Sequence, residues 1–553
     1  MLKKSLLAVL VFLFFSISFA QPTSKPSKPK LVIGLVIDQM RWDFLYRFTN
    51  LYSPNGFKRL LNNGFSCENT MIPYVPTYTA PGHATIYTGS LPSIHGIVGN
   101  NWFDKRTNRN VYCTDDSMVS AVGNSSVSGK MSPKNLWTTT ITDELRLSNN
   151  FKSKVIGISL KDRGAILPAG HTGNAAYWFD NKDGKWISSS YYMNQLPEWV
   201  NKFNDKNLPD FYMAKDWNTL LPIANYQLST EDNKEYENVI PGTTGTTFPH
   251  KLSQITTGKY LAFNYTPYGN TYTLELAKAA IEYEKLGSNN VTDFLAVSIS
   301  STDYIGHLFG PNSIEIQDTY LRLDKDIAAF LQYLDLTLGK ENYLLFLSSD
   351  HGVANVPAFS KENKIPGGVF NQAALAKNIN ELIEQKFSIK NGISSIQNYQ
   401  VYLNSKEIEN QSMLMDKALQ EKLLLEVKQY VITLLSNEPF ITNAFETEKI
   451  SGASVSESLK TMHINGYAPK RSGDIHFILK PGYFDGSNRG TTHGAWNPYD
   501  AHIPLVWFGW NIKHGTTNKE TYMTDIAPTI AAMLKIQMPN GSIGKVIEEL
   551  IKK

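Results

Sequence analysis

The sequence predicts an α/β fold in which a central, mostly parallel sheet carries helices on both faces. The first observation is a set of four continuous apolar runs of strand length, which is typical of parallel strands buried on both faces. The second is a polar cluster directly after each run, where open α/β sheets collect their functional side chains. The third is helical periodicity between the runs. The four runs are residues 31–37, 155–159, 294–299 and 343–347.

The chain begins with a segment that has the layout of a secretory signal peptide. Residues 1–20 combine a short basic start, an apolar run shorter than a typical membrane span, and small residues before Gln21. Residues 21–30 form a linker rich in Pro, Ser and Lys. We therefore expect a soluble mature protein, periplasmic or secreted, with no membrane anchor after signal cleavage. An uncleaved N-terminal anchor is the alternative.

The remaining chain is predicted to be one domain, residues 31–553, with two insertions that cap the functional site. Helical spacing is clear at residues 135–147, 273–286 and 314–336. Residues 168–272 and 357–470 interrupt the alternation of strands and helices, although the second contains a helical stretch at residues 416–435. The chain closes with expected strands at residues 474–479 and 503–508, and a last helix opens near Thr524.

Composition excludes several classes of partner. The formal net charge is only +3 and 19% of residues are charged, so no nucleic-acid-binding module is expected. We expect a monomer that acts on small substrates.

The chain has two cysteines, Cys67 and Cys113. Because export would place them in an oxidising compartment, a disulfide is favoured over two buried thiols.

A short segment around Thr79 holds a candidate nucleophile. Thr79 stands before Ala80 and Pro81 at the start of a helical stretch that reaches Gly89. It is therefore predicted to be the N-cap, with Pro81 in a first turn that does not need its missing N–H. Backbone donors and the helix dipole favour negative charge at this point, which suits an alkoxide. Capping alone is the alternative interpretation.

Candidate metal ligands follow the predicted strands. They include aspartates at strand ends, a histidine four residues after one of them, and a histidine in the segment Gly490-Thr-Thr-His-Gly. Carboxylate oxygen and imidazole nitrogen suit zinc, and six such groups with a threonine oxygen are enough for two ions. The remaining eight histidines, His83 and His95 among them, lack this placement and are not expected to bind metal. The candidates are Asp38, Asp303, His307, Asp350, His351 and His493.

These motifs together resemble those of the alkaline phosphatase superfamily, over a region from about Leu31 to Asp525. The resemblance implies two zinc ions on either side of the Thr79 oxygen. One would be held by Asp303, His307 and His493, and the other by Asp38, Asp350, His351 and Thr79. It also implies a covalent mechanism in which Thr79 attacks phosphorus, and water then hydrolyses the phosphothreonine.

Three further residues distinguish the branches of this superfamily. Asn100 can donate a hydrogen bond to a phosphoryl oxygen, and Lys161 and Arg163 follow a strand two residues apart. Two cations and an amide suit the three non-bridging oxygens of a dianionic monoester. This set is similar to the PafA-type phosphate-irrepressible alkaline phosphatases, which implies a phosphomonoesterase that releases inorganic phosphate. A solvated charged loop is the alternative for Lys161 and Arg163.

Other branches match less well. The nucleotide pyrophosphatase/phosphodiesterases resemble this chain in the metal ligands and Asn100, but have a hydrophobic pocket where Lys161 and Arg163 stand. Sulfatases expect a Cys or Ser followed by x-Pro-Ser-Arg, and phosphoethanolamine transferases carry several membrane spans. A phosphodiesterase therefore remains the alternative function, followed by a non-catalytic metal- or phosphate-binding relative.

Overall fold

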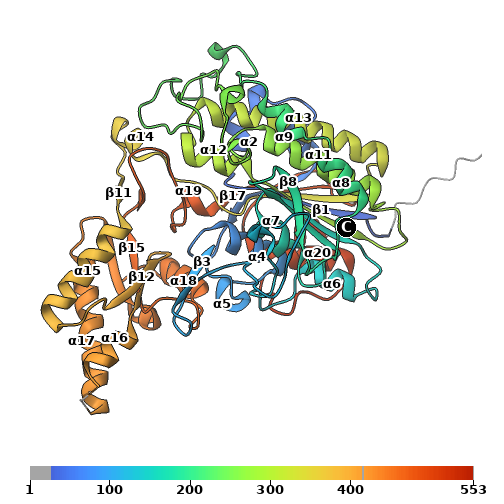
Figure 1. Cartoon of the computed structure of the whole chain (residues 1–553). Coiled ribbons are helices and arrows are strands. Elements are labelled where there is room, and N and C mark those ends of the chain that lie inside the picture. Colours follow the sequence, from blue (N-terminus) through green and yellow to red (C-terminus); the bar gives the residue numbers. More distant parts are fainter. Residues whose placement is uncertain (1–26, 414–415, 552–553) are drawn as a thin grey trace, which may run out of the picture.

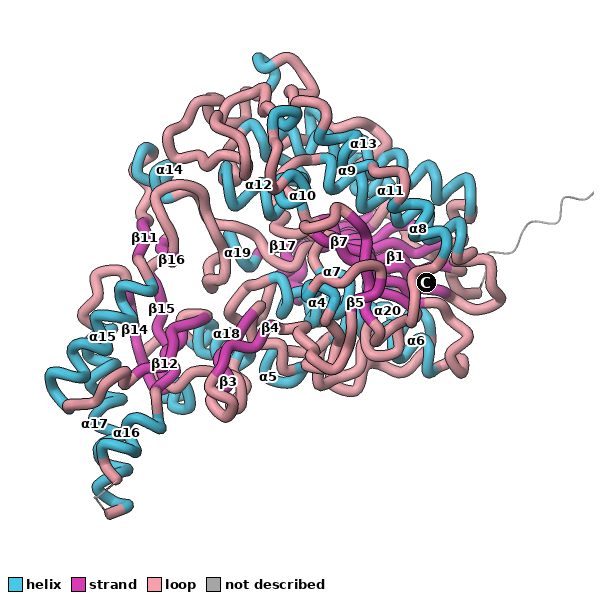
Figure 2. The backbone as a smooth tube through the Cα atoms, in the orientation of Figure 1, coloured by secondary structure: helices cyan, strands magenta, loops and turns pink. Residues whose placement is uncertain are grey.

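A computed structural model describes residues 27–413 and 416–551. The expected signal peptide and most of the expected linker lie outside these residues. Among the described residues, no helix has both the length and the apolar character needed to cross a membrane. Figures 1 and 2 show a large body built around one twisted sheet, with a smaller lobe beside it.

The central sheet is parallel in its middle and antiparallel at its edges, which confirms the predicted α/β class. The strands β10, β1, β9, β6 and β7 are parallel neighbours in that order, whereas β18 and β8 run antiparallel beside β10 and β7. The strands of this sheet are β17 (His502–Ile503), β2 (Phe65–Met71), β18 (Leu505–Gly509), β10 (Tyr343–Ser348), β1 (Leu31–Ile37), β9 (Asp293–Ile299), β6 (Val155–Ser159), β7 (Ala175–Asp180), β8 (Lys185–Ser189), β5 (Ala121–Val122) and β19 (Gly515–Tyr522).

Helices cover both faces of this sheet, as predicted. Alternate residues of β1 belong to different hydrophobic clusters, Ile33 and Leu35 to one and Val32 and Val36 to the other. The first face is covered by α2 (Phe44–Arg47), α3 (Phe57–Asn63), α8 (Glu198–Asn204), α9 (Leu208–Met213), α10 (Lys259–Phe263), α11 (Tyr268–Tyr283), α12 (Ser301–Phe309) and α13 (Ile314–Thr337). The second is covered by α4 (Thr79–Thr88), α6 (Ile141–Leu147), α7 (Asp162–Ala169) and α20 (Ile526–Leu534).

The first expected insertion is partly sheet. Its strands β7 and β8 extend the central sheet beyond β6, and Trp178 of β7 is buried against α7. The sequence pattern missed these strands because they lie in a segment that is rich in Trp, Tyr, Asn and Asp and has few long apolar runs. The predicted helix at residues 135–147 begins only at Ile141, because Thr140 and Asp143 form a capping box there.

The lobe, defined here as residues 368–485, has its own sheet and hydrophobic cluster. Its strands have the order β12-β13-β15-β14, all antiparallel, so that the expected closing strand at 474–479 pairs here and not in the central sheet. The pair β11 and β16 connects the lobe to the body. The elements are β11 (Gly368–Phe370), α15 (Gln372–Phe387), β12 (Ile393–Gln397), β13 (Gln400–Leu403), α16 (Ser405–Gln411), α17 (Lys417–Ser436), β14 (Ile441–Glu446), α18 (Glu457–Gly466), β15 (Ile475–Leu479) and β16 (Tyr483–Asp485).

The favoured disulfide is wrong. Cys67 and Cys113 are both free and buried. Cys67 lies on β2 in the hydrophobic cluster beneath α20, whereas Cys113 follows β4 (Arg109–Tyr112) and packs in a separate cluster with Ala80 and Ala84 of α4. Burial raises the pKa of both thiols to about 12. The two cysteines therefore serve as small apolar residues in different parts of the core.

Candidate functional site

The six predicted ligands come together at the carboxyl ends of three neighbouring parallel strands. Asp38 follows β1, Asp303 lies in the first turn of α12 after β9, and Asp350 follows β10. His307 is one helical turn after Asp303, and His351 directly follows Asp350. His493 comes from the loop between β16 and α19 (Pro498–Ala501).

These side chains form two clusters with metal-ligand spacing. In the first cluster, Asp303, His307 and His493 each offer one ligand atom, and the three atoms lie within 4.8 Å of one another. Asp38, Asp350 and His351 form the second cluster on the same criterion. Apart from His307, which is half-buried, all of these residues are buried. The division into two sets of three is the one that the family resemblance implies.

The histidines are oriented as metal ligands. Each Nδ1 lies at hydrogen-bond distance from a backbone carbonyl oxygen: 2.7 Å from Thr491 for His307, 2.7 Å from Thr77 for His493, and 3.0 Å from Gly352 for His351. An Nδ1–H that donates to a carbonyl leaves the Nε2 lone pair free. Each Nε2 faces the carboxylates, from 3.2 Å between His307 and Asp303 to 3.6 Å between His493 and Asp303.

The second cluster leaves carboxylate oxygens without partners. Among the described residues, Asp38 Oδ1 and Asp350 Oδ2 are buried and accept no hydrogen bond. Burial and the charge of Asp303 raise the pKa of Asp38 to about 6, and burial and Asp38 raise the pKa of Asp350 well above its usual value. Buried oxygens without partners are costly unless a cation pairs with them, so this donor set fits a divalent metal.

Lys161 connects the two clusters. It occupies the N-cap position of α7, and its Nζ lies 2.7 Å from Asp38 Oδ2 and 2.5 Å from Asp303 Oδ2. Although burial opposes the charge, Asp303 and Asp38 raise the pKa of Lys161 above its usual value. The ammonium group is therefore a fixed positive charge between the two candidate metal positions.

Thr79 lies at the second cluster. Its Oγ1 is 3.4 Å from His351 Nε2, and its side chain is buried. The predicted N-cap is wrong by one residue, because Tyr78 occupies the cap position and Thr79 is the first residue of α4. The side chain of Tyr78 makes no capping bond, and the Thr79 hydroxyl is directed to the cluster and not to backbone N–H groups. Gly89 ends the helix with a positive φ, as predicted.

Asn100 approaches the site from a loop, and Arg163 approaches it from the start of α7. Asn100 Oδ1 accepts a hydrogen bond from the Ala80 N–H at 2.9 Å, which fixes the amide beside the start of α4. Arg163 lies in the first turn of α7, and its guanidinium donates to the Tyr112 hydroxyl at 3.0 Å. Its positive charge partly opposes the rise in the pKa of Asp38. In the described structure Lys161 and Arg163 therefore have different partners: Asp38 and Asp303 for Lys161, and Tyr112 and Asp162 for Arg163.

Sequence reasoning missed Gln39. This residue has a φ of 64°, its backbone N–H donates to Asp350 Oδ1 at 3.2 Å, and its Nε2 donates to Asp303 Oδ1 at 2.7 Å. It therefore links a carboxylate of each cluster. The only signal in the sequence is that it directly follows Asp38.

His83, which the sequence analysis set aside, also contacts the site. Its Nδ1 lies 2.9 Å from the Thr79 carbonyl oxygen, its Nε2 is 2.9 Å from Ser298 Oγ, and Asp350 Oδ2 is 3.4 Å from Nδ1. Burial lowers the pKa of His83 to about 3, so the ring is neutral. With both ring nitrogens engaged, His83 positions α4 against Asp350 and is not a metal ligand.

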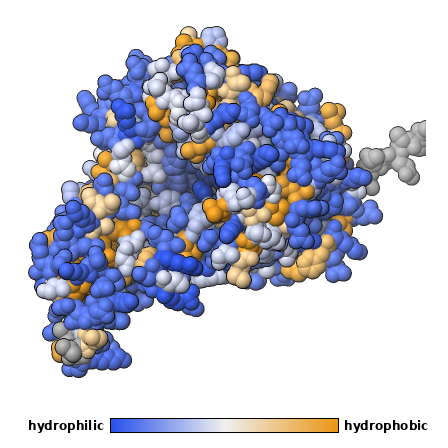
Figure 3. All heavy atoms as spheres, viewed as in Figure 1, coloured by the Kyte–Doolittle hydropathy of each residue, from blue (hydrophilic) through white to orange (hydrophobic). Residues whose placement is uncertain are grey.

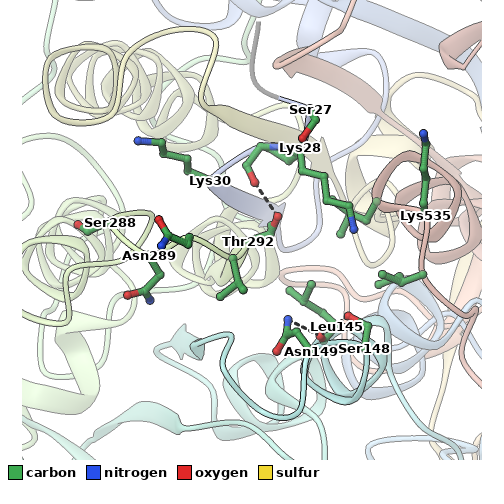
Figure 4. Close-up of a pocket in the computed structure, with 15 residues that line it drawn as sticks. Ser27, Lys28, Lys30, Leu145, Ser148, Asn149, Ser288, Asn289, Thr292 and Lys535 are labelled. Carbon is green, nitrogen blue, oxygen red and sulfur yellow. Dashed lines mark hydrogen bonds between the residues drawn. The ribbon is translucent and has the colours of Figure 1, made fainter.

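A cavity at the opposite end of the strands holds no comparable chemistry. It has a volume of about 480 Å³ and lies at the amino ends of β1 and β9. Figure 4 shows Lys28, Lys30 and Lys535 extending in different directions around it. The Thr292 hydroxyl donates to the Pro29 carbonyl oxygen at 2.6 Å. Within the described part of the chain, neither group of three potential metal ligands lies there.

Comparisons with known proteins identify relatives of this chain. A sequence profile described as type I phosphodiesterase / nucleotide pyrophosphatase matches residues 32–502. Alkaline phosphatase PhoV of Synechococcus elongatus is 52% identical over 535 residues, which is 96% of this chain and 95% of that protein. A Myroides odoratus protein named as a calcium-transporting ATPase is 52% identical over 555 residues and covers 100% of both chains.

A third relative also has solved structures. Alkaline phosphatase PafA of Elizabethkingia meningoseptica is 50% identical over 552 residues, 99% of each chain. A crystal structure of wild-type alkaline phosphatase PafA covers 95% of this chain and 99% of that chain, with a TM-score of 0.91. A structure of a PafA variant in which one threonine, one asparagine, one lysine and one arginine are substituted has a TM-score of 0.90.

Proposed function

The chain belongs to the type I phosphodiesterase / nucleotide pyrophosphatase family, and within it we propose that this protein is a zinc-dependent alkaline phosphatase that hydrolyses phosphate monoesters to inorganic phosphate. Relatives at 50% and 52% identity over nearly the whole chain are named alkaline phosphatases. The observation that carries the proposal is the position of Thr79 Oγ1 beside His351, with both ligand clusters, Lys161 and Arg163 in the same site.

Two zinc ions are the proposed cofactors. The first cluster would hold one through Asp303, His307 and His493, and the second would hold the other through Asp38, Asp350, His351 and the Thr79 oxygen. Mixed imidazole and carboxylate ligands favour zinc, and the buried, unpartnered oxygens of Asp38 and Asp350 support a cation there. When bound, zinc supplies Lewis acidity and lowers the pKa of bound hydroxyl groups.

Thr79 is the proposed nucleophile. Its hydroxyl lies at the N-terminus of α4, where the helix dipole favours negative charge, and it makes no capping bond that would compete. In the proposed reaction the Thr79 oxygen forms a bond to phosphorus as the bond to the leaving oxygen breaks. Water then hydrolyses the phosphothreonine, which restores the threonine and releases phosphate. His83 and Asn100 hold the first turn of the helix in place throughout.

Asn100, Lys161 and Arg163 are proposed to bind the phosphoryl group. The Asn100 Oδ1 is already engaged by Ala80, which leaves its amide N–H groups as donors. Arg163 adds a planar guanidinium next to Lys161, and two positive charges suit the dianion of a monoester better than the monoanion of a diester. The proposed location, periplasmic or secreted, follows from the leader-like sequence of residues 1–20.

The proposal is tested by a comparison of three esters of one leaving group. Purified protein loaded with zinc is given 4-nitrophenyl phosphate, bis(4-nitrophenyl) phosphate and 4-nitrophenyl sulfate, and kcat/KM is measured for each. We expect the monoester to be hydrolysed fastest. A larger value for the diester would favour the second candidate, a phosphodiesterase, which the family description supports. No hydrolysis of any ester would favour a non-catalytic relative.

A further inference from the structure

A polar cavity opens beside the proposed nucleophile, between the body and the lobe. It has a volume of about 550 Å³. The body contributes Tyr78, which precedes Thr79, together with Asn100, and the loop that carries His493 contributes Thr492. Figure 3 shows that the surface is hollowed between the body and the lobe and that the hollow is mainly hydrophilic. Asn100 is therefore part of both the candidate site and the wall of this cavity.

The cavity lining consists mostly of neutral hydrogen-bonding groups. Two tyrosines, Thr492 and the carboxylate of Asp485 complete it, and within the described residues no lysine, arginine or histidine lines it. Each carboxamide offers both donors and an acceptor, which matches the hydroxyl groups of an uncharged polyol. Asp485 also accepts from hydroxyl groups, but repels a second anionic group. The six carboxamides are Asn100, Asn101, Asn110, Gln372, Gln397 and Asn398.

Several of these amides are held in place before any ligand binds. Gln397 Nε2 donates to Asn110 Oδ1 at 2.6 Å, and Asn398 Nδ2 donates to the Asn101 carbonyl oxygen at 2.8 Å. Both bonds join the lobe to the hairpin of β3 (Asn101–Asp104) and β4. Gln397 Oε1 is buried and has no hydrogen-bond partner among the described residues. Fixed side chains reduce the entropy lost when a ligand binds.

We propose that this cavity is the leaving-group subsite, and that the preferred substrates are phosphate monoesters of uncharged polyhydroxy compounds, such as sugars. This inference rests on the proposed function, because it assumes that the phosphoryl group binds at Asn100. The overall reaction is hydrolysis: the ester and one water give the free alcohol and inorganic phosphate. The lobe thus selects the alcohol, and the body carries out the phosphoryl transfer.

The test compares two phosphate monoesters, one whose leaving group carries free hydroxyl groups and one whose leaving group carries none. Glucose 6-phosphate is compared with cyclohexylmethyl phosphate, which has a similar ring and a primary ester oxygen but no free hydroxyl. Methyl phosphate, which is too small to reach the lobe, reports the basal reaction. We expect wild-type kcat/KM to be at least about tenfold higher for glucose 6-phosphate than for cyclohexylmethyl phosphate, since each neutral hydrogen bond contributes about threefold to tenfold.

Two substitutions address the lobe side of the cavity. Gln397→Leu and Gln372→Leu should each reduce kcat/KM for glucose 6-phosphate about threefold to tenfold and leave methyl phosphate unchanged. The Gln372 side chain has no hydrogen bond of its own among the described residues, so Gln372→Leu tests the inference even if Gln397→Leu unfolds. Gln195→Leu, at an exposed amide outside the cavity, is the matched control.

The outcomes separate this inference from the proposed function. If wild type hydrolyses methyl phosphate but shows no preference for glucose 6-phosphate, the inference is overturned and the proposed function stands. The inference is also overturned, and the proposed function stands, if both Leu variants keep the wild-type ratio of kcat/KM for glucose 6-phosphate to kcat/KM for methyl phosphate. If wild type hydrolyses no monoester, the proposed function fails and the inference fails with it.

Discussion

Each histidine of the two clusters depends on a single backbone carbonyl. Thr491, Thr77 and Gly352 each present an oxygen to an Nδ1, and this fixes which nitrogen faces the site. Burial and its histidine neighbour His307 lower the pKa of His493 to about 3, so its ring is neutral, as a ligand must be. The geometry needed for metal binding is therefore set by the protein itself.

Arg163 offers the cleanest residue-level test of monoester recognition, because Lys161 also pairs with Asp38 and Asp303. We expect Arg163→Ala to lower kcat/KM for 4-nitrophenyl phosphate about tenfold to a hundredfold, the value of one charged hydrogen bond. The loss for bis(4-nitrophenyl) phosphate should be much smaller, because a diester has one negative charge. Arg109→Ala, at an exposed arginine of β4, is the control. Equal losses for both esters would rule out this role.

The ligand residues could be predicted from sequence because strand ends and residue types mark them. Asp38, Asp303 and Asp350 each follow an apolar run, and His307 and His351 stand at short spacing from an aspartate. Gln39 and His83 could not be predicted, because each acts through a hydrogen bond to a residue distant in sequence. Gln39 bonds to Asp303, and His83 bonds to Ser298. No local pattern records such a contact.

At the level of elements, α4 is placed by close backbone contact. A Cβ on Gly82 would lie 2.5 Å from the Asp350 carbonyl oxygen, so only glycine lets the first turn approach the second cluster. This contact explains why Thr79 can lie next to His351. The glycine in the segment Thr79–His83 is thus part of the site, although the sequence alone indicates only a helix start.

Gly82→Ala should destabilise the protein, although replacing glycine by alanine inside a helix usually increases stability. We expect a loss of about 1–3 kcal/mol in the free energy of unfolding, since overpacking against backbone cannot relax easily. Urea unfolding measures the change. At Gly245 an added Cβ meets nothing within 4 Å, so Gly245→Ala should change stability by less than about 0.5 kcal/mol. A Gly82→Ala protein as stable as wild type would contradict the proposed placement of α4.

Strand boundaries were predicted best where the sequence has a continuous apolar run of strand length. The strands β1 and β6 have the predicted bounds, and all of their residues are buried. The strands β7 and β8 were missed, although β7 is fully buried, because both lie in a segment with few long apolar runs. The helix expected from residue 135 begins at Ile141, because the capping box of Thr140 outweighs the apolar spacing before it.

On the scale of the whole molecule, the body and the lobe have separate cores. The lobe has its own sheet and hydrophobic cluster, and β15 completes that sheet from a segment expected to belong to the body. Sequence periodicity identifies a strand but not its partner, so it could not assign β15. The lobe and the body together line the polar cavity beside Asn100.

Two buried histidines of the lobe predict a loss of stability in acid. His463 and His476 lie 4.2 Å apart between ring centroids, and neither ring nitrogen of His463 has a partner among the described residues. Burial lowers the pKa of His463 to about 4, and burial with His463 lowers that of His476 well below its usual value. The pKa of these histidines is therefore lower in the folded state than the value of about 6.5 in the unfolded state. Their contribution to the stability of the fold is fully present above pH 6.5 and is lost as the pH falls toward about 4.

His463→Phe should therefore reduce the acid sensitivity of unfolding. We expect the variant to lose about 2 kcal/mol less than wild type between pH 7 and pH 5, measured by urea unfolding at each pH. His514→Phe, at an exposed histidine, should follow the wild-type curve. If His463→Phe shows the wild-type pH dependence, the histidine is not the acid-sensitive group.

The central claim is that Thr79 attacks phosphorus at a site assembled from segments far apart in the sequence. The most direct measurement is phosphate release from 4-nitrophenyl phosphate by wild type, Thr79→Ser and Thr79→Ala, each with its bound zinc determined. We predict that Thr79→Ala loses at least about a thousandfold in kcat/KM while Thr79→Ser, which keeps a hydroxyl, retains much more activity. A Thr79→Ala protein within about tenfold of wild type at equal zinc content would contradict the claim.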